Sequence, residues 1–347
     1  TVLPVTILSF INNNSLKTTQ QNESYVSLES SAKLFAQRVD EFVLANRASI
    51  AAQSYLPIYS QYLHLNSKER PGSSEETAVI TSIESYRAAL KVKERAFLTS
   101  IAILDLDGQV VYTSNKEDIS RWDEVNTDFF RKPIETGVSY ASNVIFSPVD
   151  NVPYIFFSGP IRDKNSTIVG VLRVKFQARI FQKISEEYTG SLEEAKYPIL
   201  LDEDYIRLAQ PFRPQLLFQS LVPLARDRLN VLVSSGRMPA VLHSTNLTEM
   251  AAFLDNYQET PHFTGWSDSS RTDQMSVVKL YSRQWYVVFL QDEGVLQAQL
   301  AEQANLAVLI ATILATVISL ITLRAARAFS DPLNELTRSA LEISNGN

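Results

Sequence analysis

Two aspartates lie one residue apart in the stretch SIAILDLDGQVVYTS, between two apolar runs. Asp105 and Asp107 could hold a calcium ion, because carboxylate oxygens are its preferred ligands. An EF-hand loop beginning at Asp105 needs glycine and glutamate where this chain has Val110 and Lys116. The alternative is a turn in which aspartate binds its own backbone and Gly108 supplies a positive φ. Because the calcium pattern fails, we favour the turn and predict no metal and no cofactor.

Histidine and serine offer no catalytic motif. The three histidines are His64, His243 and His262, and none belongs to an H-E-x-x-H sequence. The chain has no G-x-S-x-G sequence and no glycine-rich phosphate loop. A serine–histidine–aspartate arrangement assembled by the fold stays open. We predict no active site in these residues and leave open whether a longer protein is an enzyme.

The composition describes a protein that buries a core without thiol chemistry. Apolar residues make up 45% and charged residues 20% of the 347 residues, as in ordinary globular domains. The net charge of −6 comes without a long basic block, which argues against nucleic acid as a partner. The absence of cysteine excludes disulfides, thiolate metal sites and cysteine nucleophiles.

One stretch has the length and composition of a membrane span. Residues 303–323 carry no charged side chain, and about 20 apolar residues cross a bilayer as a helix. A buried core helix is the alternative. Glu302 precedes the stretch, whereas Arg324 and Arg327 follow it. By the positive-inside rule, the residues after 323 are cytoplasmic.

The N-terminal run TVLPVTILSFI, residues 1–11, is too short to span a bilayer and lacks the basic region of a signal peptide. We interpret it as the outer end of a first transmembrane helix. The chain is then a multi-pass protein of the inner (plasma) membrane, with the lipid bilayer as a partner. Residues 12–302 are expected to be extracytoplasmic and residues 324–347 cytoplasmic.

The extracytoplasmic part begins with helices over residues 12–96. Proline and glycine are absent from Asn14 to Leu56, which predicts a long helix. Apolar residues at alternating spacings of four and three form a heptad-like seam, which packs on its own domain, on a dimer partner, or on both. The seam consists of Leu28, Ala32, Phe35, Val39 and Phe42. Ser73-x-x-Glu76 is a capping box that opens a second helix, to about Val92.

From Phe97 the pattern changes to short β-rich runs separated by turn residues. Five runs predict a five-stranded antiparallel sheet, with a short helix ending at Gly137 after the second strand. A second module, from about 196 to 293, opens in the same way, with Asp202-x-Asp204 echoing Asp105-x-Asp107. It has helical stretches between Pro214 and Tyr257, and MSVVKLYS and RQWYVVFLQD predict a closing hairpin. This is an α+β layout.

In their order, these elements resemble the double Cache family of extracytoplasmic sensor domains of bacterial transmembrane receptors. The resemblance is carried by ILDLDGQVVYTS, DFFRKPIETG, SYASNVIF, PYIFFSGPIRD and TIVGVLRVKF. It implies a long N-terminal helix and two PAS-like antiparallel-sheet (Cache) modules. The membrane-distal module covers 97–190 and the membrane-proximal module 191–302, before the transmembrane helix at 303–323.

The tail SDPLNELTRSALEISNGN, within residues 324–347, resembles the first helix of a HAMP linker. Positions 333, 336, 340 and 343 give the heptad-like face that a parallel coiled coil needs. An ordinary amphipathic juxtamembrane helix is the alternative.

The resemblance also implies a ligand pocket in the distal module, between the sheet and the small helix and loops that cross it. We expect it to be lined by Arg121, Trp122, Phe129, Phe130, Arg131, Tyr140, Ser142 and Phe157. Aromatic walls with an arginine suit a small, partly apolar anion such as a carboxylate. The alternative is that the phenylalanines belong to the core and the arginines are solvated.

The amino-acid-binding branch of this family carries Arg-x-Trp-Tyr on the small helix and an aspartate on a later strand. This chain has Thr127-Asp128-Phe129-Phe130 there, and Asp150 falls in a hairpin turn. The departure puts an amino acid in doubt as the ligand.

The sequence thus predicts a transmembrane signal receptor that acts as a homodimer and senses a small molecule. The output domain that the resemblance favours is a sensor histidine kinase of a two-component system. The alternatives are a chemoreceptor, a nucleotide cyclase or a phosphatase receptor, or a membrane-anchored binding module without signalling output.

Overall fold

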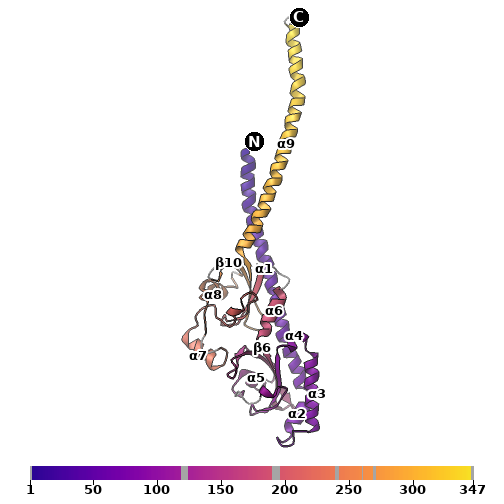
Figure 1. Ribbon diagram of the computed structural model, residues 1–347, viewed down its shortest axis with the longest axis vertical. Helices are drawn as coiled ribbons and strands as arrows, with labels where there is room; N and C mark the ends of the chain where they lie inside the picture. Colours follow the sequence, from indigo (N-terminus) through magenta and orange to yellow (C-terminus); the bar gives the residue numbers. More distant parts are fainter. Residues whose placement is uncertain are drawn as a thin grey trace. The chain divides into compact units, whose positions relative to one another are not determined.

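The computed structural model describes residues 2–118, 124–189, 196–238, 242–259, 261–268 and 271–344 (Figure 1). The chain divides into two compact units. The large unit is residues 22–292, and the terminal unit combines residues 1–21 with residues 293–347.

The long helix α1 (Val2–Ser54) supplies the central core of the large unit. All five seam residues, from Leu28 to Phe42, are at most 6% exposed. They share one apolar cluster with residues of both sheets, and the Phe42 ring packs edge-on against Phe157 and Phe176. The prediction that the seam packs on its own domain is therefore confirmed, and the dimer contact stays a prediction.

Three helices follow α1 (Figure 1): α2 (Pro57–His64), α3 (Ser74–Ala89) and α4 (Val92–Arg95). The predicted capping box is confirmed at the start of α3. Ser73 Oγ accepts the N–H of Glu76 at 3.0 Å, and Glu76 Oε2 accepts the N–H of Gly72 at 2.6 Å. The helix ends at Ala89, three residues before the predicted end.

Replacing Ser73 with alanine is expected to lower the free energy of unfolding by about 1 kcal/mol, because the Glu76 amide loses its acceptor. Urea unfolding of the full chain in detergent, followed by tryptophan fluorescence, measures the change. Ser74→Ala is the control, since its exposed hydroxyl binds only the neighbouring Glu75 carboxylate, and a change below about 0.5 kcal/mol is expected. Equal losses in the two variants would contradict the cap.

Sheet A contains six antiparallel strands in the order β2-β1-β6-β5-β3, with β4 also pairing with β5. They are β1 (Leu98–Leu104), β2 (Val110–Thr113), β3 (Tyr140–Ala141), β4 (Ile145–Phe146), β5 (Pro153–Arg162) and β6 (Ile168–Gln177). Five strands were expected, and the third run is divided into β3 and β4. The reason is local: Ser142 Oγ accepts the amide N–H of Phe156 at 2.9 Å, so a side chain takes a position in the ladder.

The two faces of sheet A bury different clusters. The inner face packs on α1 through residues such as Ile103, Phe157 and Val174. The outer face packs under α5 (Asp128–Thr136), which contributes Phe129 and Phe130. This helix ends at Gly137 with φ of 70°, as predicted.

Sheet B has the order β8-β7-β11-β10-β9, again antiparallel. Its strands are β7 (Lys196–Leu201), β8 (Arg207–Ala209), β9 (His262–Asp268), β10 (Arg271–Lys279) and β11 (Tyr286–Asp292). The predicted hairpin is confirmed as β10–β11, whereas β9 was not predicted. The helices here are α6 (Arg179–Thr189), α7 (Arg226–Ser234) and α8 (Thr248–Asp255), with a 3₁₀ turn η2 (Pro214–Leu216). Helix α8 buries Met250 and Leu254 in one cluster with residues of β7, β10 and β11.

The acidic turns that open the two modules have the same geometry, which confirms the turn interpretation. Asp105 Oδ1 accepts the amides of Asp107 and Gln109 at 3.1 and 2.9 Å. Asp202 Oδ1 accepts the amides of residues 204 and 206, both at 2.9 Å. The left-handed position is Gly108 in the first turn and Tyr205 in the second, with φ of 74° and 58°.

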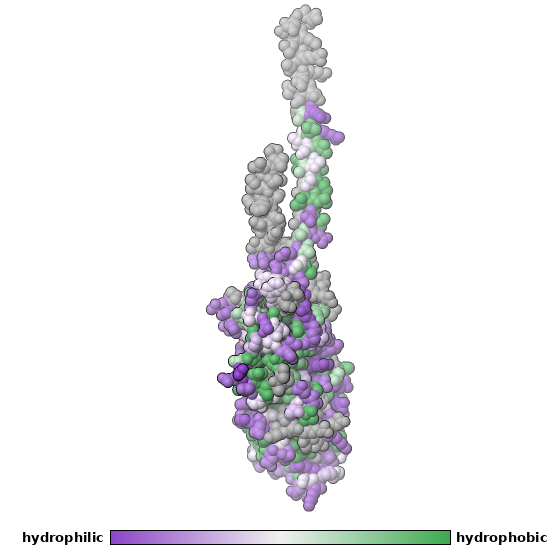
Figure 2. Space-filling model, turned by 60° about the vertical axis from the view of Figure 1, so that its left-hand side comes forward, coloured by the Kyte–Doolittle hydropathy of each residue, from purple (hydrophilic) through white to green (hydrophobic). Residues whose placement is uncertain are grey.

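In the terminal unit, α9 (Glu293–Ser344) contains the one helical stretch of the described residues that is long and apolar enough to cross a membrane. It is Val308–Arg327, with a mean hydropathy of 2.2, and Figure 2 shows it as a mostly green segment of α9. It overlaps the predicted span at 303–323. The first span stays a prediction, and the side chains of the HAMP segment beyond Arg327 lie outside the described residues.

Candidate functional site

Two cations project from β6, a central strand, onto the outer face of sheet A. Side chains alternate along a strand, so Leu172 and Val174 face α1 while Arg173 and Lys175 face outward, over the Phe156 ring. Arg173 is fully buried and the Lys175 side chain is only 7% exposed. Buried cations need partners, because a charge taken out of water without one is costly.

Two carboxylates pair with these cations. Asp118 is the last residue of η1 (Lys116–Asp118), and Glu124 precedes α5 in the chain. Arg173 Nη2 donates to Asp118 Oδ2 at 3.0 Å, and Arg173 Nε lies 2.9 Å from Glu124 Oε2. Lys175 Nζ donates to Asp118 Oδ1 at 2.7 Å. Ser100 on β1 accepts from Arg173 at 3.1 Å and donates to Asp118. We call Asp118, Glu124, Arg173 and Lys175 the ion cluster; its formal charges cancel.

Burial affects the two carboxylates of the ion cluster differently. Burial acts to raise the pKa of Asp118, but Arg173 and Lys175 outweigh it, and the pKa lies below its usual value. Burial dominates at Glu124 and raises its pKa, although Arg173 opposes the change. Asp118 is therefore the carboxylate that keeps its negative charge more readily, and Glu124 is the one that takes up a proton more readily.

Aromatic rings surround the ion cluster. Phe129 of α5 stacks on Phe156 of β5 with 4.1 Å between ring centroids. Lys175 Nζ lies 4.1 Å from the centroid of the Tyr154 ring, and the Tyr154 hydroxyl donates to Asp150 Oδ2 at 2.9 Å. Charged groups backed by aromatic faces can hold a ligand that has both a charge and an apolar part.

The predicted pocket residues are distributed unevenly around this site. Arg121 and Trp122 lie outside the described residues, within 119–123, the segment whose flanking residues Asp118 and Glu124 belong to the ion cluster. Phe129 is fully buried on the outer face and Phe130 is buried beside it.

The remaining predicted polar residues, Arg131, Tyr140 and Ser142, come later in the sequence of the distal module. Arg131 extends from α5 with 54% of its side chain exposed and binds Glu135 at 3.0 Å. Tyr140 packs half-buried against the outer-face cluster. Ser142 is fully buried, and its hydroxyl donates to the carbonyl oxygen of Asn143 at 2.6 Å.

Phe157, which the sequence analysis placed among the lining residues, lies on the other face of sheet A from Phe129 and Phe130. Neighbouring residues on β5 face opposite sides of the sheet, and Phe156 takes the outer face. Phe157 is fully buried on the inner face, edge-on to Phe42 of α1.

Sequence reasoning missed all four members of the ion cluster. The available signal was Arg-x-Lys in the otherwise apolar strand VGVLRVKF, where period-two alternation puts both cations on one face. Asp118 and Glu124 gave no signal, because their approach to β6 depends on the path of the chain after β2.

The outer edge of sheet A also contacts the second module. Arg283, just before β11, donates to the side-chain oxygen of Asn143 at 3.0 Å and to the carbonyl of Ala141. Asn143 in turn donates to Glu203 Oε1 at 2.9 Å, and Arg237 lies 2.9 Å from the same oxygen. Burial lowers the pKa of Arg283 to about 10, as expected for a guanidinium enclosed between the modules.

The fold matches that of known sensory domains. Searches of protein-family models and of curated proteins find no match to the chain. Among solved structures, the ligand-binding domain of the Campylobacter jejuni chemoreceptor Tlp3, in complex with L-valine, matches 81% of this chain and 97% of its own length, with 14% identity and a TM-score of 0.52. The sensor domain of the Vibrio cholerae histidine kinase DctB matches 78% and 99%, with 14% identity and a TM-score of 0.51. The predicted fold, that of double Cache sensory domains, is confirmed.

Proposed function

We propose that this chain is the sensing part of a transmembrane signal receptor, and that its large unit binds a small, partly apolar anion on the outer face of sheet A. The observation that carries the proposal is the pair of buried cations, Arg173 and Lys175, backed by aromatic rings. The fold shared with sensory domains supports it. The Tlp3 domain is described in complex with L-valine, which is a carboxylate.

A ligand carboxylate would act by competing with the protein's own carboxylates. Asp118 and Glu124 flank residues 119–123, and both bind the same arginine. An anion that pairs with Arg173 or Lys175 would displace one or both of these carboxylates from the cations. Glu124 is the easier one to displace, because its raised pKa means that burial already disfavours its charged form. The predicted lining residues other than Phe157, including Arg121 and Trp122, belong to this proposal.

The signal would pass through the contact between the modules. Arg283 holds Ala141, the last residue of β3 in the distal module, and Asn143 shortly after it. Three residues later the chain enters β11, and β11 leads without a break into α9. A change at the edge of sheet A would therefore bias the packing of β11 and the start of α9. Such a bias needs two packing states that the ligand binds with different affinity.

The remaining parts of the proposed receptor rest on predictions from the sequence. The large unit would be extracytoplasmic, in a multi-pass protein of the inner membrane that acts as a homodimer. Residues 324–347 would begin a HAMP linker, and a sensor histidine kinase is the output domain we favour. A chemoreceptor, a nucleotide cyclase, a phosphatase receptor and a binding module without output remain the alternatives.

The proposal predicts that a carboxylate ligand stabilises the full chain. A panel of small mono- and dicarboxylates is added to the chain in detergent, and a binder is expected to raise the melting temperature by roughly 3 °C or more. Lys175→Met should abolish this rise, because it removes a buried charge but keeps the length of the side chain. Lys164→Met, on an exposed turn of the same module, should leave it intact.

Two results would contradict the site. One is a panel in which no carboxylate raises the melting temperature of the wild-type chain. The other is a rise that survives Lys175→Met in a chain that still melts cooperatively. Arg131→Ala tests the predicted lining separately, and a weaker effect than that of Lys175→Met is expected because Arg131 binds Glu135 at the surface.

A further inference from the structure

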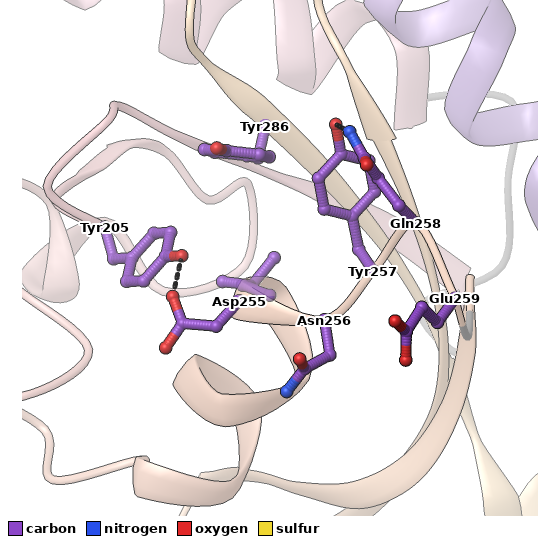
Figure 3. A pocket seen from close by; sticks show the side chains of 8 residues that line it. Tyr205, Asp255, Asn256, Tyr257, Gln258, Glu259 and Tyr286 are labelled. Atoms are coloured by element: carbon purple, nitrogen blue, oxygen red, sulfur yellow. Dashed lines mark hydrogen bonds between the residues drawn. The ribbon is translucent and has the colours of Figure 1, made fainter.

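A second concave site lies in the proximal module. Its volume is about 340 Å³, at the lower end of the range for small-molecule sites. It lies where the turn between β7 and β8, the end of α8 and the start of β11 meet (Figure 3). The lining consists of Tyr205, Leu254, Asp255, Asn256, Tyr257, Gln258, Glu259 and Tyr286.

Three tyrosine rings form walls of this pocket, which we call the tyrosine pocket. Tyr286 lies between the other two, with its ring centroid 5.8 Å from that of Tyr205 and 5.6 Å from that of Tyr257. Both pairs are strongly inclined, at 63° and 77°. Rings set at such angles make the sides of a box, and each aromatic face carries negative charge density. Figure 3 shows the three rings on different sides of the open space.

The charged side chains that line the pocket are all negative. Asp255 and Glu259 are its ionisable carboxylates, and none of the eight described lining residues is basic. The Tyr205 hydroxyl donates to Asp255 Oδ1 at 2.6 Å (Figure 3), which holds this carboxylate at the rim. Burial and the neighbouring Tyr257, Asp255 and Glu203 raise the pKa of Tyr286, so the neighbouring charges disfavour a further negative charge.

One of these rings belongs to a residue whose backbone conformation is strained. Tyr205 has φ of 58°, a region that tyrosine rarely adopts. The matching turn of the distal module has Gly108 at this position, which adopts it without a side-chain clash. A bulky aromatic residue at this position is explained if its side chain is needed in the pocket.

We infer that the tyrosine pocket binds a small organic cation of the quaternary ammonium class. Aromatic faces attract such a cation through their negative charge density, and the methyl groups around its charge suit an apolar box. The carboxylate of Asp255 supplies the countercharge. This site is separate from the ion cluster, because all its lining residues belong to the proximal module, and it does not depend on an anion binding at sheet A.

The test compares two probes of the same shape. Isothermal titration calorimetry is performed on the full chain in a maltoside detergent, which contains no ammonium group. Choline is the cationic probe, and 3,3-dimethylbutan-1-ol replaces its nitrogen by carbon and is uncharged. We expect choline to bind at least about tenfold more tightly than the alcohol.

Variants assign the binding to the pocket. Tyr257→Leu is expected to weaken choline binding about tenfold, because it removes one aromatic wall at a half-buried position. Asp255→Asn should weaken it severalfold while keeping the shape of the side chain. Tyr281→Leu is the control, since this tyrosine is 91% exposed and does not line the pocket, and it should leave the affinity unchanged.

The inference is overturned if the wild-type chain binds the two probes equally or does not bind choline. It is also overturned if Tyr257→Leu leaves choline binding unchanged, because the cation would then bind outside the tyrosine pocket. A cooperative melt of each variant establishes that it is folded.

Discussion

Replacing Arg173 with methionine is expected to lower the free energy of unfolding by about 3–5 kcal/mol. The guanidinium is fully buried and holds Asp118, Glu124 and Ser100 at once. Methionine fills much of the same space, so the loss comes mainly from carboxylates left buried without their partner. Breaking a buried ion pair from one side has this cost. Urea unfolding of the full chain in detergent, followed by tryptophan fluorescence, measures it.

Two further variants separate charge from packing. Arg131→Met removes a guanidinium from the same module, but one whose ion pair with Glu135 is exposed, and a loss below about 1 kcal/mol is expected. Adding Glu124→Gln to Arg173→Met should recover part of the stability, because one unpaired carboxylate disappears. If Arg173→Met costs no more than Arg131→Met, or if Glu124→Gln makes the double variant worse, the ion cluster is not what stabilises this face.

The importance of Arg173 could not be predicted from its strand alone. Alternating cations in an apolar run are equally compatible with an edge strand whose outer face is solvated and with a central strand whose outer face is buried. Only the order β2-β1-β6-β5-β3 makes β6 central, and only Asp118 and Glu124, from outside the strand, pair with Arg173 and Lys175. Both facts depend on contacts between residues far apart in sequence.

Local features were predicted more accurately, because they depend on a few neighbouring residues. The Ser73 cap, the end of α5 at Gly137 and the turn at Asp105 all occur as expected. The same acidic turn occurs a third time, where Asp163 Oδ1 accepts the amides of Asn165 and Thr167 at 2.9 and 2.8 Å. A short polar side chain that binds the next amides fixes such a turn regardless of the surrounding fold.

Among the turn aspartates Asp105, Asp163 and Asp202, Asp202 has the most unusual environment. It is 6% exposed and lies beside Glu203 and Asp204, so three acidic residues share two arginines. Arg237 approaches all three, at 3.3, 2.9 and 3.3 Å, and Arg228 binds Asp204 at 2.6 Å. Burial, assisted by the excess of negative charge, raises the pKa of Asp202 to about 7 despite Arg237.

The raised pKa makes the stability of the folded chain depend on pH. In the unfolded chain the same carboxyl has its ordinary pKa of 3.8. Between the two values the folded state holds a proton that the unfolded state lacks, so this site's contribution to stability falls as the pH rises from about 4 to about 7. The separation of the two pKa values corresponds to about 4 kcal/mol.

Asp202→Asn is therefore expected to match the wild-type chain in stability near pH 4 and to exceed it by about 4 kcal/mol near pH 8. Asparagine keeps the Oδ1 atom that accepts the amides of Asp204 and Ile206, so the turn is retained while the charge is removed. Urea unfolding of both chains at a series of pH values measures the difference.

Asp105→Asn is the matched control, because Asp105 makes the same two backbone contacts but is half-buried and lies in the other module. Its effect is expected to stay below about 1 kcal/mol at both pH values. If the stability curves of the wild-type chain and Asp202→Asn run parallel from pH 4 to 8, the buried carboxyl does not exchange a proton on folding. If they diverge as expected, the charge balance around Arg237, which also binds Glu203 and through it Asn143 of the distal module, changes with pH at the contact between the modules.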